Sequence, residues 1–180
     1  MTGTTQADQD TAPGLETDLA RERTYAWSEP KQTAAVGAGL TGLEFLAAIS
    51  EGRVAPPPVM STLDFDGSAF DEGRAEFRLT PKEFHYNPIG SVHGGVLATM
   101  LDSACGCAVH TKLPVGVSYT SLDLSVRFLR PALVDTGQII AVGSVVHLGR
   151  RTALAEARIV DAAGKIYATA TSSCLIIRPE

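Results

Sequence analysis

The chain has 180 residues, of which 44% are hydrophobic and 19% are charged. This length and composition indicate one domain with a buried core and exclude a wholly disordered chain. The net charge of -5 argues against a nucleic-acid partner, because phosphate binding needs a basic surface. The sequence shows no secretory signal and no apolar run of about 20 residues, and its three Cys are an odd number. We therefore expect a cytoplasmic protein with free thiols and no membrane partner.

The first 35 residues differ from the rest in charge and in apolar pattern. They carry six acidic and three basic residues, so they hold -3 of the net charge, and they lack apolar periodicity. The sequence predicts a disordered acidic tail over residues 1–35, with at most a short helix near Leu15–Tyr25. Residues 36–180 are expected to form one compact domain.

A helix is expected at the start of this domain. Thr41 and Glu44 have the spacing of a capping box, and apolar residues follow at helical spacing up to Ser50. Gly52 and three prolines after it are typical of a helix end. The alternation and turn residues that follow predict two strands, Val59–Phe65, which ends at an Asp66-Gly67 turn, and Arg74–Leu79.

Residues 91–113 are mostly apolar and too long for a strand, so they predict a buried helix of about five turns. One stripe of this helix has small side chains around an acidic residue: Ala98, Asp102, Cys105 and Gly106. Further strands are expected over Leu122–Phe128, Gln138–Leu148, Ala153–Val160 and Ile166–Ile177, the last two as a hairpin. One buried helix against an antiparallel sheet is an α+β architecture.

The stretch from Asn87 to Asp102 has the residues for chemistry at a carbonyl group. Gly94 and Gly95 lie where the buried helix begins, and the first amides of a helix have no partner within it. Glycine leaves such amides uncovered, so they can form an oxyanion hole, although a Gly-Gly pair is more often only a tight turn. Asp102 lies in an apolar helix, where a carboxylate needs a partner or a use.

The spacing between Gly94 and Asp102 has a consequence for assembly. Eight residues of helix separate the two residues by about 12 Å along the axis, so one chain cannot bring both to a single reacting carbon. If both act on one substrate, two antiparallel copies of the helix around a two-fold axis must supply them. The catalytic interpretation therefore predicts a homodimer.

The motif N-x-x-G-x-x-H-G-G-x-x-x-x-x-x-D, followed by L-D-L-S-V-R-F-L-R-P-A, resembles the hotdog-fold acyl-CoA thioesterases. The most similar group is the PaaI-like (phenylacetic acid degradation type) branch, which is related to 4-hydroxybenzoyl-CoA thioesterases. The resemblance covers residues 39–178 and implies a curved antiparallel sheet around a long central helix. It also implies active sites at the interface of a homodimer, which two dimers can extend to a homotetramer.

The resemblance also implies roles for individual residues. Asn87 and the Gly94 amide would bind the thioester carbonyl, and Asp102 of the other subunit would be the nucleophile or the general base. A Ser or Thr at the start of the next strand would position that carboxylate or the water, and the candidates are Ser121 and Thr120. His93 and Gly95 are further candidates for substrate contacts; His93 is either a hydrogen-bonding residue beside the turn or a base.

Coenzyme A carries phosphates, so its binding needs a local basic patch. Arg150 and Arg151 are the first candidates, unless they form only a solvated turn, and Arg130 is the next. No metal is expected, because the spacing of the four His residues is not that of a ligand set. No cofactor is expected either, since coenzyme A is part of the substrate.

Two other functions remain open on the same fold. A non-catalytic module that binds or senses acyl-CoA would keep the pocket without needing Asp102, and a hotdog enoyl-CoA hydratase would act on a double bond. The combination of Asp102 with Asn87 and Ser121 favours the thioesterase. The acyl group stays open.

Overall fold

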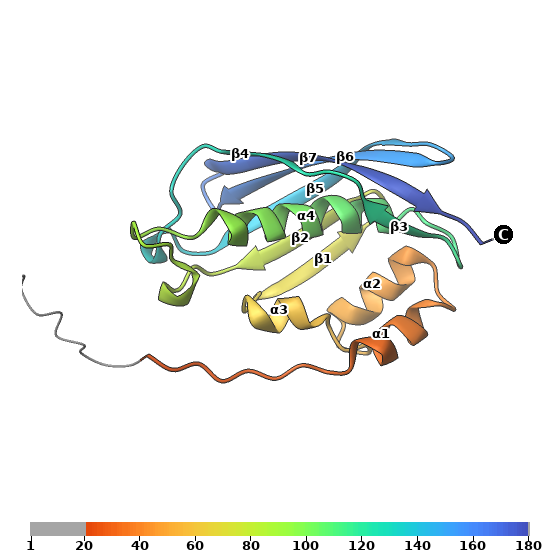
Figure 1. Cartoon of the computed structure of the whole chain (residues 1–180), viewed down its shortest axis with the longest axis horizontal. Coiled ribbons are helices and arrows are strands. Elements are labelled where there is room, and N and C mark those ends of the chain that lie inside the picture. Colours follow the sequence, from red (N-terminus) through yellow and green to blue (C-terminus); the bar gives the residue numbers. More distant parts are fainter. Residues whose placement is uncertain (1–20, 180) are drawn as a thin grey trace, which may run out of the picture.

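The computed structural model describes residues 21–179, in which a curved antiparallel sheet packs against one long helix (Figure 1). The strands follow the order β1-β2-β5-β6-β7-β3, and β4 also pairs with β7. Their bounds are β1 Gly67–Asp71, β2 Arg74–Leu79, β3 Ser118–Ser121, β4 Ser125–Phe128, β5 Ile139–Leu148, β6 Thr152–Asp161 and β7 Ile166–Ile177. The expected α+β hotdog class is confirmed.

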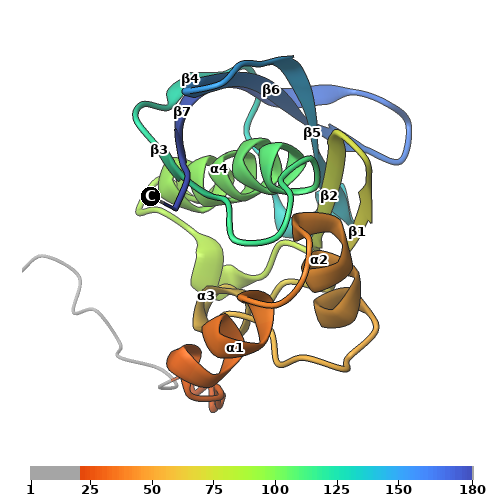
Figure 2. The same ribbon diagram turned by 90° about the vertical axis from the view of Figure 1, so that its right-hand side faces the viewer.

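Helix α4 (Gly94–His110) forms the centre of the core. Figure 2 shows the sheet curving around α4, while α1 (Pro30–Gly37), α2 (Gly42–Ser50) and α3 (Pro58–Thr62) lie together on the opposite side from β6. Strand β5 approaches α4 closely at Gly143. A Cβ added to this residue would lie only 2.2 Å from the Ala104 carbonyl oxygen. A glycine is needed at that crossing, since any side chain would strike the helix backbone.

Several predicted elements are confirmed with small shifts at their ends. The capping box is present, because the Thr41 hydroxyl accepts from the Glu44 amide and the Glu44 carboxylate accepts from the Thr41 amide. Helix α4 is shorter than the predicted 91–113, because His93 caps its first turn. Strands β2, β5, β6 and β7 match their predicted ranges to within a few residues, and β6 and β7 form the expected hairpin.

The prediction of a strand over Val59–Phe65 is wrong. This segment holds α3, which has Pro58 in its first turn, and proline favours that position because its φ is already helical. The prediction of a turn at Asp66-Gly67 is also wrong, because Gly67 is the first residue of β1. Met60 of α3 and Leu63 and Phe65 after it pack against the core.

The prediction of one strand over Leu122–Phe128 is wrong as well. The chain leaves the sheet after Ser121 and returns at Ser125, so β3 and β4 are separate strands along β7. Polar contacts of Asp123 hold this interruption. Its carbonyl accepts from the Ser172 hydroxyl at 2.8 Å, and its carboxylate accepts from the Ser173 amide at 3.0 Å.

Helix α1 crosses the domain boundary expected at residue 35, and residues 21–29 precede it without regular structure. The first 20 residues of the expected tail lie outside the described residues, as does most of the segment near Leu15–Tyr25. Among the residues that the structure describes, no helix has the length and apolarity to cross a membrane.

Candidate active site

The loop before α4 holds the Asn87 side chain in a fixed orientation. The Asn87 carbonyl oxygen Oδ1 accepts from the amides of Ile89 and Ser91 at 3.0 and 3.2 Å. Its Nδ2 donates to the Ser91 hydroxyl at 3.1 Å. An amide group has two N–H donors, so one of them remains for a ligand. The loop thus fixes Asn87 as a hydrogen-bond donor.

In the first turn of α4 the Gly94 amide is free, while the Gly95 amide donates to a side chain. His93 is the N-cap, and its Nδ1 accepts from the Gly95 amide at 2.8 Å. This bond places the imidazole proton on Nε2 and leaves Gly95 without a free donor. Among the hydrogen bonds of residues 21–179, none uses the Gly94 amide, so this donor is free at the positive end of the helix.

Phe128 covers the same helix end, and the sequence did not indicate it. A Cβ added to Gly94 would lie 3.0 Å from Cζ of the Phe128 ring. The apolar alternation placed Phe128 on the core face, but 55% of it is exposed. The exposed ring of Phe128 therefore borders the Gly94 amide and can contact a ligand bound there.

Asp102 and Ser121 are paired between α4 and β3. The Ser121 hydroxyl donates to Asp102 Oδ1 at 3.2 Å. Successive residues of a strand point to opposite faces, and Tyr119, which lies against Gly106 of α4, shares its face with Ser121. Thr120 therefore points away from Asp102. Of the two candidates named from the sequence, the structure brings Ser121 to the carboxylate.

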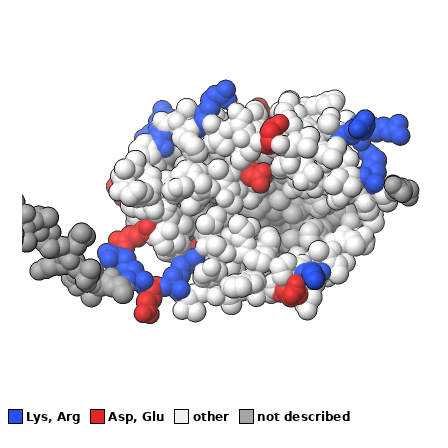
Figure 3. Space-filling model, viewed as in Figure 1, with Lys and Arg blue, Asp and Glu red and all other residues white. Residues whose placement is uncertain are grey.

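A hollow of about 420 Å³ opens at this pair. Its lining is Ala98, Thr99 and Asp102 from α4 and the segment 121–124, so its walls are largely apolar. The face seen in Figure 3 carries acidic side chains near its middle and most of its Lys and Arg side chains along its margin. Asp102 itself is exposed in the single chain. A carboxylate beside an apolar, accessible hollow can act on a ligand bound there.

The structure does not bring Gly94 and Asp102 of one chain together. Both lie on the uninterrupted helix α4, where eight residues give a separation of about 12 Å. If Gly94 and Asp102 act on one substrate, a second copy of α4 has to supply one of them, and this assembly stays a prediction.

The candidate arginines lie at two ends of the molecule. Arg150 and Arg151 form the exposed turn between β5 and β6, beside the end of β7. Arg130 donates to the Ile166 carbonyl at the start of β7, which is a strand of 12 residues. Within one chain the three side chains thus do not form one patch. Arg130 lies at the end where α4 begins, because Ala132, two residues after it, accepts a hydrogen bond from the Val92 amide just before that helix.

The three thiols are poor candidates for a nucleophile. Burial raises the pKa of Cys105 and of Cys107 to about 12, so both are protonated at neutral pH, and Cys174 is buried. Within residues 21–179, no three His, Cys, Asp or Glu side chains are grouped so that they could hold a metal ion.

A matched pair of substitutions tests the assignment of Ser121. Ser121→Ala removes the hydrogen bond to Asp102, and we expect it to lower kcat for the thioester cleavage that the resemblance implies by about tenfold or more. Thr120→Ala alters the other face of the same strand and should change kcat by less than about twofold. Steady-state rates of the two purified variants decide this, and a larger loss in Thr120→Ala would reverse the assignment.

Comparison with known proteins identifies the family of this chain. The model of the Thioesterase superfamily matches residues 89–168. A solved protein of Ralstonia eutropha JMP134, named as a thioesterase and as phenylacetic acid degradation-related, is 30% identical, with a TM-score of 0.65. The alignment covers 72% of this chain and 98% of that one. The chain belongs to the thioesterase superfamily. The resemblance noted from the motif is therefore confirmed, and so is the enzyme class that it implies, a thioester hydrolase.

Two curated relatives have names that state an activity. A protein of Halobacterium salinarum named as an esterase is 43% identical over 76 residues, which are 41% of this chain and 48% of that protein. The chain therefore matches about half the length of this relative. A 1,4-dihydroxy-2-naphthoyl-CoA hydrolase of Listeria monocytogenes is 22% identical over 60% of this chain and 86% of its own length. The match of the family model, over residues 89–168, includes α4 and the residues from 89 to 93 before it, but not Asn87.

Proposed function

We propose that this protein is an acyl-CoA thioesterase, which hydrolyses the thioester of an acyl- or aryl-CoA to a free acid and CoA. The observation that carries the proposal is the Asp102–Ser121 hydrogen bond at an apolar hollow. Membership of the thioesterase superfamily and the name of the Listeria relative support the substrate class. Water is the second reactant, and coenzyme A enters as part of the ester.

The proposed site is shared by two copies of the chain around a two-fold axis. One copy supplies the Gly94 amide and Asn87, and the other supplies Asp102 with Ser121. The exposure of Asp102 and the 55% exposure of Phe128 in a single chain support a face that a second copy covers. Association of two such dimers is compatible with this arrangement.

In the proposed reaction the Gly94 N–H and the free N–H of Asn87 donate to the thioester carbonyl oxygen. These donors stabilise the negative charge that develops on that oxygen, which is the largest contribution in many acyl transfers. The Asp102 carboxylate either attacks the carbonyl carbon itself or removes a proton from an attacking water. In both cases the C–S bond breaks, and the CoA sulfur leaves as a thiolate that takes up a proton. If Asp102 is the nucleophile, water then cleaves the acyl–Asp102 anhydride, which releases the free acid and restores the carboxylate.

The lining of the hollow suggests which part of the substrate lies there. Ala98, Leu122 and Leu124 provide apolar contacts beside Asp102, so the acyl or aryl group is the part that gains from burial. The phosphates of CoA need cations, and Arg130 is the candidate at the end where α4 begins. Arg150 and Arg151 are the candidates at the other end of the chain, beside the end of β7.

A thiol-release assay with a panel of aryl-, short-chain and medium-chain acyl-CoAs tests the proposal. We expect release of free CoA from at least one class. A binding module would bind these esters without releasing thiol. A hydratase would consume the chromophore of a 2-enoyl-CoA without releasing thiol, and either result would contradict the proposed function.

A further inference from the structure

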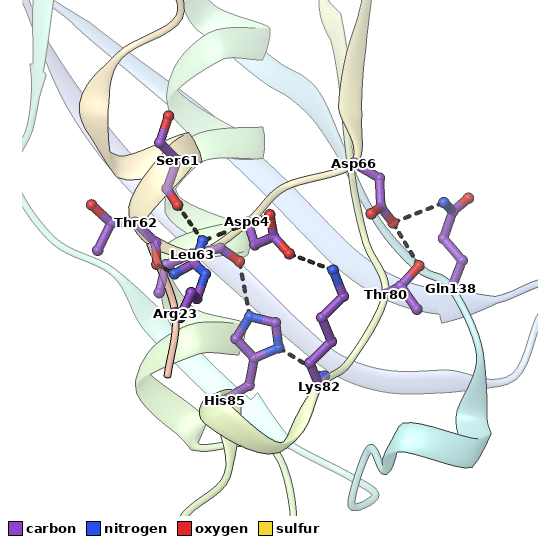
Figure 4. A network of polar contacts seen from close by, with 10 residues as sticks. All are labelled: Arg23, Ser61, Thr62, Leu63, Asp64, Asp66, Thr80, Lys82, His85 and Gln138. Carbon is purple, nitrogen blue, oxygen red and sulfur yellow. Dashed lines mark hydrogen bonds and ion pairs between the residues drawn. The ribbon is translucent and has the colours of Figure 1, made fainter. Parts of the chain in front are cut away.

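The segment 21–29 lies outside the family resemblance, yet one of its side chains is anchored in the domain. Arg23 is the one residue between 21 and 32 that is partly buried, while the others are exposed. Its guanidinium donates to the carbonyls of Ser61 and Thr62, where α3 ends (Figure 4). The last carbonyls of a helix lack partners within it and carry the negative end of its dipole, so a guanidinium that donates to two of them is a strong anchor.

The same guanidinium also contacts the segment after β2. It lies over the Phe84 ring, 4.4 Å from the ring centroid, which is a cation–π geometry. The Phe84 ring is in turn 4.3 Å from the His85 ring, centroid to centroid. Arg23 therefore joins the end of α3 to the short segment 83–85.

His85 connects these two places to the candidate active site. Its Nε2 donates to the Leu63 carbonyl at 2.9 Å, and its Nδ1 accepts from the Lys82 amide at 3.0 Å (Figure 4). Its backbone carbonyl accepts from the His93 amide at 2.7 Å. Because His93 is the N-cap of α4, each step from Arg23 to the Gly94 amide is a direct contact or a covalent neighbour.

The loop that holds Asn87 begins and ends beside His85 and His93. Tyr86 and Val92 form an isolated antiparallel bridge, and the Asn87 amide donates to the Ser91 carbonyl at 2.8 Å. His85 and His93 lie at the two bases of this loop. A shift of His85 would thus move the Asn87 and Gly94 donors relative to each other.

We propose that Arg23 is a positioning residue that fixes the loop before α4 in the geometry with which Asn87 and Gly94 face the carbonyl. This role rests on the proposed thioesterase function. The donors must lie within tenths of an ångström of their best positions, and misplacement by about 1 Å can cost about 100-fold in rate. The segment 21–29 is therefore a functional part of the enzyme and not only a connection to the preceding residues.

The test compares Arg23→Ala, Arg23→Lys and a matched control in the full-length chain. The control is Arg21→Ala, because Arg21 also contacts the segment 83–85, through an ion pair with Glu83. This pair lies at the surface, with the Arg21 side chain 71% exposed and the Glu83 side chain 63% exposed. We expect Arg23→Ala to lower kcat about tenfold with KM within about twofold. Arg23→Lys should recover part of the loss, and Arg21→Ala should match the wild type.

Amide hydrogen exchange separates positioning from a general loss of stability. With Arg23→Ala, the amides of Val92 and His93 should exchange faster while those in β6 and β7 stay as slow as in the wild type. An active wild type beside an Arg23→Ala variant with unchanged kcat and unchanged loop exchange would overturn the role of Arg23 alone. A uniform rise in exchange, with activity lost in proportion to folded protein, would also overturn it. A wild type that cleaves no CoA ester would contradict the proposed function itself, and the role of Arg23 with it.

Discussion

Asp102→Ala is expected to lower kcat for thioester hydrolysis by about 1,000-fold or more while the protein stays folded. The carboxylate would be the group that attacks or activates water, and loss of such a group removes the reactive step itself. The fold does not depend on it, because Asp102 is exposed and is held by a hydrogen bond from Ser121. Thiol release and a thermal unfolding curve measure the two effects separately.

Asp102→Asn is the matched control for this result. The amide keeps an oxygen that can accept from the Ser121 hydroxyl, but it cannot take up a proton or attack as a carboxylate does. We expect it to be as inactive as Asp102→Ala. Near-normal turnover in both variants would remove Asp102 from the mechanism.

Gly94→Pro is expected to lower kcat by about 100- to 1,000-fold, the usual effect of deleting one oxyanion-hole donor. Proline removes the N–H and is favoured in the first turn of a helix. The preceding residue, His93, has φ -60° and ψ 135°, which is the conformation that a following proline prefers. The substitution therefore deletes the donor with little cost to the helix, and steady-state kinetics with the best CoA ester measure the loss.

Gly94→Ala keeps the N–H and adds nearly the same Cβ, which would lie 3.0 Å from the Phe128 ring. That ring is exposed and can move by a few tenths of an ångström, so we expect kcat within about threefold of the wild type. If alanine lowered the rate as much as proline does, crowding against Phe128 would explain the loss, and the amide would not be a catalytic donor.

The sequence predicted the elements whose signals are local. The Thr41–Glu44 box, the alternation in β2 and the length of the apolar stretch around α4 each follow from one short segment. Short apolar runs such as Val59–Phe65 are not decided by their pattern, because five to seven residues fit either period. The proline before this run fits both the end of one helix and the first turn of the next. The break between β3 and β4 depends on contacts of Asp123 with β7, which no local pattern shows.

The candidate site was predicted in part for the same reason. The motif supplied Asn87, Gly94 and Asp102, and the choice between Thr120 and Ser121 needed only the register of β3. Arg23 and Phe128 could not be found, because their roles arise from contacts between segments distant in the chain. Arg23 reaches residues 38 and 39 positions away, and its segment has the composition of a tail.

The central claim is that each site combines Gly94 of one copy with Asp102 of another, and subunit complementation tests it most directly. Asp102→Ala and Gly94→Pro chains, each inactive alone, are unfolded together in equal amounts and refolded as mixed dimers. Half of the dimers are then mixed and each of these has one intact site, so the account predicts about a quarter of the wild-type activity. Mixtures as inactive as the separate variants would contradict a shared site, since every chain then carries a defect in its own site.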